Sequence, residues 1–123
     1  QFVEAKHFSN NEIWSTAVPK VIGQIGRYES QLSKGKTKIL SEYIDYIKII
    51  NRIFNIALPE PEEIDDKVTL LIFGFDNDQK NGRLKKLITQ NKEYADAGIR
   101  NYSIGNIKKV VPHNLWKKCC NEI

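Results

Sequence analysis

Glu4 and Lys6, near the start of the chain, are the first residues whose types and spacing could do chemistry. They lie in a run of strand-forming residues. Because side chains alternate across a strand, residues 2, 4 and 6 share one face. A carboxylate there can hold a hard divalent cation, and the neighbouring ammonium can orient the attacking water in phosphodiester hydrolysis. The alternative interpretation is a surface strand with an ion pair along one face.

A helix has to bring further groups to that strand. Residues 9–11 indicate a loop, and Ser15 or Thr16 could cap a helix with Pro19 in its first turn. Apolar residues then follow helical spacing over 17–32. On this helix Gln24 and Tyr28 lie one turn apart and share a side, so they could point together at the strand. The alternative is that both are polar residues of the helix surface.

Together these two elements resemble the active-site half of the PD-(D/E)XK nuclease superfamily, which has the restriction-endonuclease-like fold. The resemblance rests on Glu4-x-Lys6 on a strand and on Gln24 and Tyr28 on the next helix. It implies that Glu4 and the backbone carbonyl of Ala5 bind the metal and that Lys6 positions the nucleophilic water. Gln24 and Tyr28 would support the site or contact the phosphate.

The resemblance also implies a function, and it implies a further strand that residues 1–123 do not contain. It implies a nuclease domain that depends on Mg²⁺ or Mn²⁺ and hydrolyses DNA, with RNA left open, in a restriction or defence system. Lys20, Arg27 and His7 would contact the nucleic acid, although His7 at a strand end also fits a plain surface residue. The family has a further Asp on an upstream strand, and nothing precedes Gln1. Because Met is also absent, we expect residues 1–123 to be one domain, a fragment of a longer protein that cleaves poorly alone.

Asp76 and Asp78 form a competing metal site. They follow the apolar run 68–75, which predicts a strand buried on both faces, and ligands of α/β sheets gather where such strands end. With Gly82 they resemble the D-x-D element of TOPRIM domains, which implies a phosphotransfer or nicking domain that uses Glu4 as a further acid. The alternative is that Asp76 and Asp78 form a turn and cap the following helix.

Charge and composition limit the kinds of binding partner that the chain can have. The net charge is +4, but residues 60–66 hold five of the fifteen acids, and the rest of the chain carries nineteen basic and ten acidic side chains, a balance of +9. Such a surface suits a polyanion, so a basic module that binds nucleic acid without catalysis is a third hypothesis. No apolar run approaches the ~20 residues of a membrane span, and we expect no membrane partner. Cys119 and Cys120 are adjacent, which favours reduced thiols and a cytoplasmic protein.

The remaining elements predict an α/β fold, with a mixed or parallel sheet flanked by helices. A break at 34–36 separates the first helix from a second over 37–55, whose wide apolar stripe fits core packing or a partner or homo-oligomer surface. An acidic connector with prolines follows over 56–67. A helix over 82–94 leads to a strand over 99–104, parallel to the previous one because a helix joins them. A short final helix is expected over 114–120.

Overall fold

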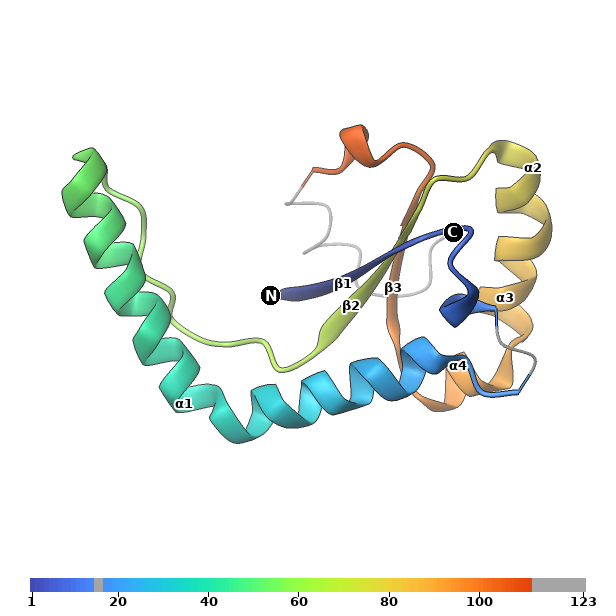
Figure 1. Cartoon of the computed structure of the whole chain (residues 1–123), viewed down its shortest axis with the longest axis horizontal. Helices are drawn as coiled ribbons and strands as arrows, with labels where there is room; N and C mark the ends of the chain where they lie inside the picture. The colour runs from blue at the N-terminus through green and yellow to red at the C-terminus, as the bar shows by residue number, and fades with distance from the viewer. Residues whose placement is uncertain (15–16, 112–123) are drawn as a thin grey trace.

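A parallel three-stranded sheet forms the centre of the molecule (Figure 1). The computed structural model describes residues 1–14 and 17–111. The strands are β1 (Phe2–His7), β2 (Val68–Phe73) and β3 (Arg100–Ile104), in the order β1-β2-β3. The predicted α/β class and the parallel pairing are therefore confirmed. β2 ends two residues earlier than expected, because Gly74 turns the backbone with φ +80°.

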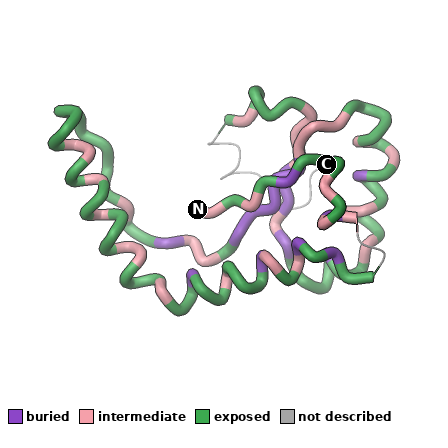
Figure 2. The backbone as a smooth tube through the Cα atoms, in the orientation of Figure 1, coloured by how far each residue is buried: buried purple, intermediate pink, exposed green. Residues whose placement is uncertain are grey.

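The core lies on the sheet face that carries Leu70 and Ile72. Figure 2 shows buried residues along the strands and on the nearby part of the long helix. Apolar side chains of the long helix α1 (Lys20–Phe54) pack there, chiefly Val21, Ile25 and Leu32. The opposite face of β2 is also buried at Thr69 and Leu71, so the continuous apolar run did predict a strand covered on both faces.

α1 is one helix of 35 residues, and the predicted break at 34–36 is wrong. A glycine inside a helix costs about 1 kcal/mol, but it ends the helix only where the backbone turns left-handed. Gly35 does not make that turn, whereas Asn55 does, with φ 50°. The helix begins at Lys20, with Pro19 at the capping position rather than in the first turn, and the expected caps Ser15 and Thr16 lie outside the described residues.

The two parts of α1 differ in what surrounds them. Residues 20–40, which we call the base, pack against the sheet. Residues 41–54, the arm, project past it, apart from Tyr43, whose ring meets Phe2 of β1 edge-on with the centroids 6.3 Å apart (Figure 1). The connector 56–67 has no regular structure, as predicted, and runs back along the arm. Asn51 holds its start, because the side chain accepts from Leu58 N at 2.8 Å and donates to Leu58 O at 2.9 Å.

Helical turns link β2 to β3, but they differ from the single helix predicted over 82–94. They comprise α2 (Asn77–Gln79), a π-helical segment (Lys80–Leu84), α3 (Lys85–Gln90) and α4 (Lys92–Asp96). The interruption falls at Asn91, whose extended backbone ends α3 and whose side chain accepts from Tyr94 N at 3.2 Å. The final helix predicted over 114–120 lies outside the described residues.

Candidate active site

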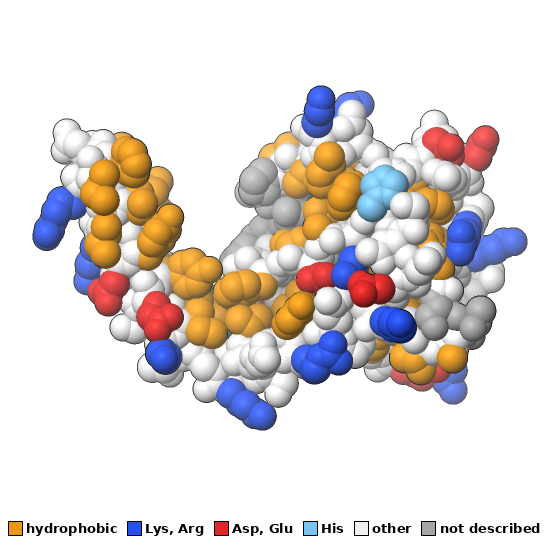
Figure 3. Space-filling view, viewed as in Figure 1, with side chains coloured by type: hydrophobic (Ala, Val, Ile, Leu, Met, Phe, Trp, Pro, Cys, Tyr) orange, Lys and Arg blue, Asp and Glu red, His pale blue; other side chains and the backbone are white. Residues whose placement is uncertain are grey.

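Lys6 is the centre of a small charged cluster on the core-facing side of β1. Its side chain is only 10% exposed, and its Nζ lies 2.9 Å from Glu4 Oε1 and also donates to Glu12 Oε2. The predicted alternation is confirmed, since Phe2, Glu4 and Lys6 turn inward while Val3, Ala5 and His7 are exposed. Figure 3 shows acidic and basic side chains gathered at the middle of this face of the molecule.

Glu12 is the residue that the sequence reasoning missed. It lies in the 3₁₀ turn Asn11–Ile13, where the Asn10 side chain accepts from Glu12 N at 2.9 Å. The fully buried Ile13 anchors this turn in the core, and its carbonyl accepts from the Tyr94 hydroxyl at 3.1 Å. The turn therefore folds back over the end of β1 and delivers a second carboxylate to Lys6. Asn10 as a capping residue and the apolar Ile13 were the only local signals.

The electrostatics of the cluster keep Lys6 charged. Burial disfavours the ammonium, but hydrogen bonds to Glu12 and Glu4 and their negative charges outweigh it and raise the pKa of Lys6 above its ordinary value. The same hydrogen bond and the charge of Lys6 lower the pKa of Glu12. A lysine in this state cannot act as a general base at neutral pH, so its chemistry is that of a cation and hydrogen-bond donor.

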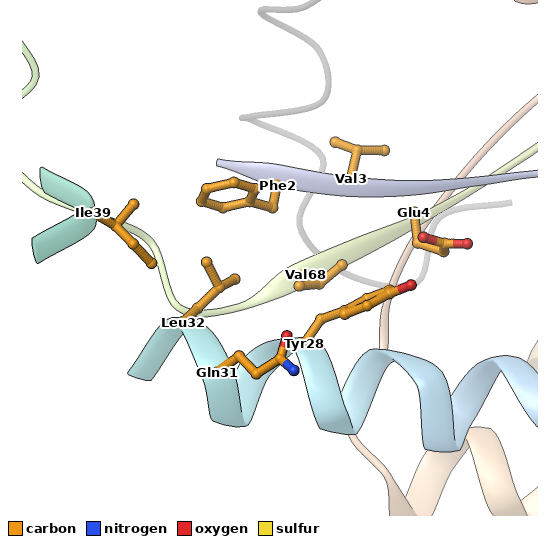
Figure 4. A pocket seen from close by; sticks show the side chains of 8 residues that line it. All are labelled: Phe2, Val3, Glu4, Tyr28, Gln31, Leu32, Ile39 and Val68. Carbon is orange, nitrogen blue, oxygen red and sulfur yellow. The ribbon is translucent and has the colours of Figure 1, made fainter. Parts of the chain in front are cut away.

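Gln24 and Tyr28 lie on the side of α1 that faces this cluster. Gln24 Nε2 donates to Tyr28 Oη at 3.3 Å, and Gln24 Oε1 is buried with no hydrogen-bond partner within the described residues. Tyr28 and Glu4 line one cavity of about 350 Å³, and Figure 4 shows the phenol and the carboxylate turned toward each other. The strand and the base of α1 thus place Glu4, paired with Lys6, and Tyr28, bonded to Gln24, on the walls of one cavity.

A second cavity of about 410 Å³ adjoins the cluster on the Glu12 side. Lys20, Gln24 and Arg27 line it together with Glu12, so both predicted phosphate contacts open onto the same hollow. Lys20 is close enough to contribute to the lowered pKa of Glu12. The arrangement offers two cations at the mouth of the site.

His7 is not brought to this cluster. It lies on the exposed face of β1, where its Nδ1 is 2.8 Å from Ser9 Oγ and its ring meets Phe73 edge-on. The ring also fills the space beside Gly74, where a Cβ would lie 2.2 Å from His7 Nε2. The position matches the surface interpretation, and any contact of His7 with nucleic acid would be on the opposite face from Lys6.

Asp76 acts as a helix cap. Its carboxylate accepts from Gln79 N at 2.8 Å, and the Gln79 side chain accepts from Asp76 N at 3.0 Å, which is a capping box. Asp78 is exposed in the first turn of α2. Glu4 pairs with Leu70 in the sheet, so ~10 Å of strand alone separates its level from the end of β2. Glu4 is therefore not placed to join the two aspartates.

The cluster does not provide a complete set of protein ligands for Mg²⁺, but it could bind the ion together with water and substrate phosphates. No group of three or more His, Cys, Asp and Glu side chains within residues 1–14 and 17–111 could hold a metal ion. Mg²⁺ is commonly bound by only one or two carboxylates together with water and substrate phosphates. Glu4 and Glu12 supply that number of carboxylates, and both are ion-paired with the ammonium of Lys6.

Comparisons of the chain with family models, with curated proteins and with solved structures found no match. Among the described helices, none combines the length and the apolar character that crossing a bilayer requires. The geometry of the cluster around Lys6 is therefore what a functional assignment has to rest on.

Proposed function

We propose that this chain is a metal-dependent nuclease domain of the restriction-endonuclease-like type, which hydrolyses phosphodiester bonds in DNA. One observation carries the proposal: the nearly buried Lys6 is held between Glu4 and Glu12 beside a cavity that Tyr28 also lines. Burying charges is costly, and an apolar side chain of similar volume often serves stability as well or better. A charged group on a core-facing strand therefore points to chemistry.

Each residue of the cluster has a distinct role in this proposal. Glu4 and Glu12 would hold the divalent ion, with the Ala5 carbonyl as a further oxygen donor. When bound, the ion supplies Lewis-acid activation of water and of the phosphate. Glu12 offers a second carboxylate from within the chain, whereas the family pattern has its second acid on an upstream strand. With both carboxylates binding the metal ion, Lys6 could donate hydrogen bonds to the attacking water or to the phosphate.

The helix residues would position the substrate. Tyr28 and Gln24 would face the reacting phosphate, and Gln24 Oε1, which is buried without a hydrogen-bond partner among the described residues, is suited to accept a hydrogen bond from water there. Lys20 and Arg27 would hold neighbouring backbone phosphates, a contact that fixes register without reading sequence.

The test is Mg²⁺-dependent cleavage of DNA, measured in single turnover because we expect the chain alone to cleave slowly. Glu4→Gln and Lys6→Met should each lower the rate at least about 100-fold, since each removes a group that touches the reacting atoms. Lys38 and Glu42 form an exposed ion pair on α1 at 3.9 Å, so Glu42→Gln and Lys38→Met make the same two chemical changes away from the site. Unchanged cleavage in Glu4→Gln and Lys6→Met would end the proposal.

Direct binding of Mn²⁺, followed by calorimetry, gives a readout that does not need turnover. We expect Glu4→Gln and Glu12→Gln each to weaken it, and Asp78→Asn to leave it unchanged. Loss of binding in Asp78→Asn alone would instead support the TOPRIM-like alternative. DNA binding that is sensitive to salt but indifferent to metal, without cleavage, would support the non-catalytic basic module.

A further inference from the structure

The arm of α1 exposes an unusual amount of apolar surface. Twelve large hydrophobic residues are exposed in the described part of the chain, and five of them lie in the arm. Ile49, Ile53 and Phe54 are 56%, 67% and 64% exposed. Figure 3 shows hydrophobic side chains gathered on the projecting part of the molecule, beside the hollow that separates it from the rest. Contiguous apolar patches of this kind mark interaction sites.

The spacing within the patch is that of a helix-pairing seam. Tyr46, Ile49 and Ile53 recur at intervals of three and four residues, so they form one stripe along the arm. The connector does not cover this stripe, because it is held on another side of the helix through Asn51 and Leu58. A second helix can therefore lie along the arm without displacing any described contact.

The charges beside the stripe identify the partner helix as a second copy of this chain. Asp45 and Arg52 precede Tyr46 and Ile53 by one position, so both flank the stripe on the same side. In a two-fold antiparallel pair the same flanks meet with their ends reversed, which sets Asp45 of each copy against Arg52 of the other, twice by symmetry. A parallel pair would instead bring identical residues to the same level. Neither Asp45 nor Arg52 forms an ion pair among the described residues.

We propose that the arm, residues 41–54, mediates an antiparallel homodimer, with Tyr46, Ile49 and Ile53 in the seam and Asp45 paired with Arg52 of the second copy. The interface lies on the part of α1 that leaves the sheet, so it is separate from the cluster around Lys6 and does not depend on the proposed nuclease activity.

Sedimentation equilibrium of the full chain tests the proposal. The wild-type chain should show twice its monomer mass, and Ile49→Asp should weaken the dimer at least about 100-fold by placing a charge in the seam. Asp45→Arg and Arg52→Asp should each weaken it about tenfold, since each removes two ion pairs and creates like-charge contacts. The double variant Asp45→Arg/Arg52→Asp restores both pairs in reverse and should regain wild-type affinity.

Lys48→Asp is the matched control. It makes the same change of charge as Arg52→Asp on the same exposed helix, but residue 48 lies on the side away from the stripe, so the dimer should be unaffected. Circular dichroism of each variant checks that the helix is intact. A monomer at every concentration, equal effects of Lys48→Asp and Arg52→Asp, or a double variant weaker than either single one would overturn the proposal. So would a monomer that instead sediments with anionic lipid vesicles.

Discussion

The base and the arm belong to one helix and contain the same kinds of apolar residue, yet the buried side chains of this helix all lie in the base. Ile25 in the base is fully buried, whereas Ile53 in the arm is 67% exposed. The reason is length. A strand of six residues spans ~20 Å, whereas a helix of 35 residues spans ~52 Å, so the helix must extend past the sheet that it covers. The hydrophobicity of a helix residue therefore does not by itself show that the residue is buried. The extent of the sheet that faces the helix decides which apolar residues enter the core.

Deleting a side chain from each part should give the largest contrast. We expect Ile25→Ala to lower the free energy of unfolding by about 4 kcal/mol, through lost burial and a residual cavity. Ile53→Ala should change it by less than about 0.5 kcal/mol when measured at concentrations where the chain is monomeric. Urea denaturation of both variants measures the difference. Equal losses would mean that the arm is as well packed as the base.

Breaking α1 at Gly35, within the base and ahead of the arm, is the next test. Gly35→Pro removes an intrahelical hydrogen bond and clashes with the preceding turn, at a cost of about 3 kcal/mol. Hydrogen exchange should then accelerate across residues 36–54 while the amides of β2 stay protected. Gly35→Ala is the control, because its Cβ would meet only the flexible end of Ile39, at 3.3 Å, and alanine favours the helix. Uniform loss of protection in Gly35→Pro would show that the two parts unfold together.

Loosening the connector from the arm should have a smaller effect. Asn51→Ala removes both hydrogen bonds to Leu58 and should cost about 1–2 kcal/mol. Asn51→Asp keeps the acceptor for Leu58 N but loses the donor, so it should cost about half as much. Thermal unfolding compares the two variants, and identical values would argue that only one of the bonds matters.

An ion pair between Asp65 Oδ2 and Arg100 Nη1, 2.6 Å apart, joins the connector to β3. We expect its removal to have the smallest effect on stability. Burial opposes ionisation of Asp65, but hydrogen bonds from Lys67 N and Arg100 and the charge of Arg100 prevail and lower its pKa. A carboxyl whose pKa is lowered by folding stabilises the protein above its unfolded pKa, ~3.9, and loses that contribution as the pH falls through the folded value. Asp65→Asn should therefore cost about 1 kcal/mol at pH 7, and this cost should shrink as the pH falls below ~3.9. A cost that stays constant through acid pH, in unfolding curves measured over this range, would contradict this.

Local patterns predicted the strands and the faces of β1 because alternation and apolar runs are properties of consecutive residues. The placement of Glu4 and Lys6 on one face of a strand, and of Gln24 and Tyr28 on one side of a helix, was predictable for the same reason, since strand or helix spacing fixes each pair. The approach of the two pairs follows from the expectation that the first helix covers the first strand.

The misses have non-local causes. The predicted break at Gly35 rests on glycine being a poor helix former, but a cooperative helix of 35 residues absorbs one such cost. Glu12 was overlooked because its contact with Lys6 depends on Ile13 being buried beneath β1, which the residues around Glu12 do not specify. The interruption at Asn91 depends likewise on a side-chain cap to Tyr94 that competes with a continuous helix.

The pairing of Phe2 with Val68 has a consequence for how the chain reaches its native state. These neighbours in the sheet are separated by 66 positions, which include the entire helix and the acidic connector. Closing so long a loop is entropically costly and slows folding, unless the helix forms early and shortens the search. The arm thus lengthens the loop that must close before β1 can pair with β2. The rate of folding should therefore depend on how readily α1 forms in the unfolded chain.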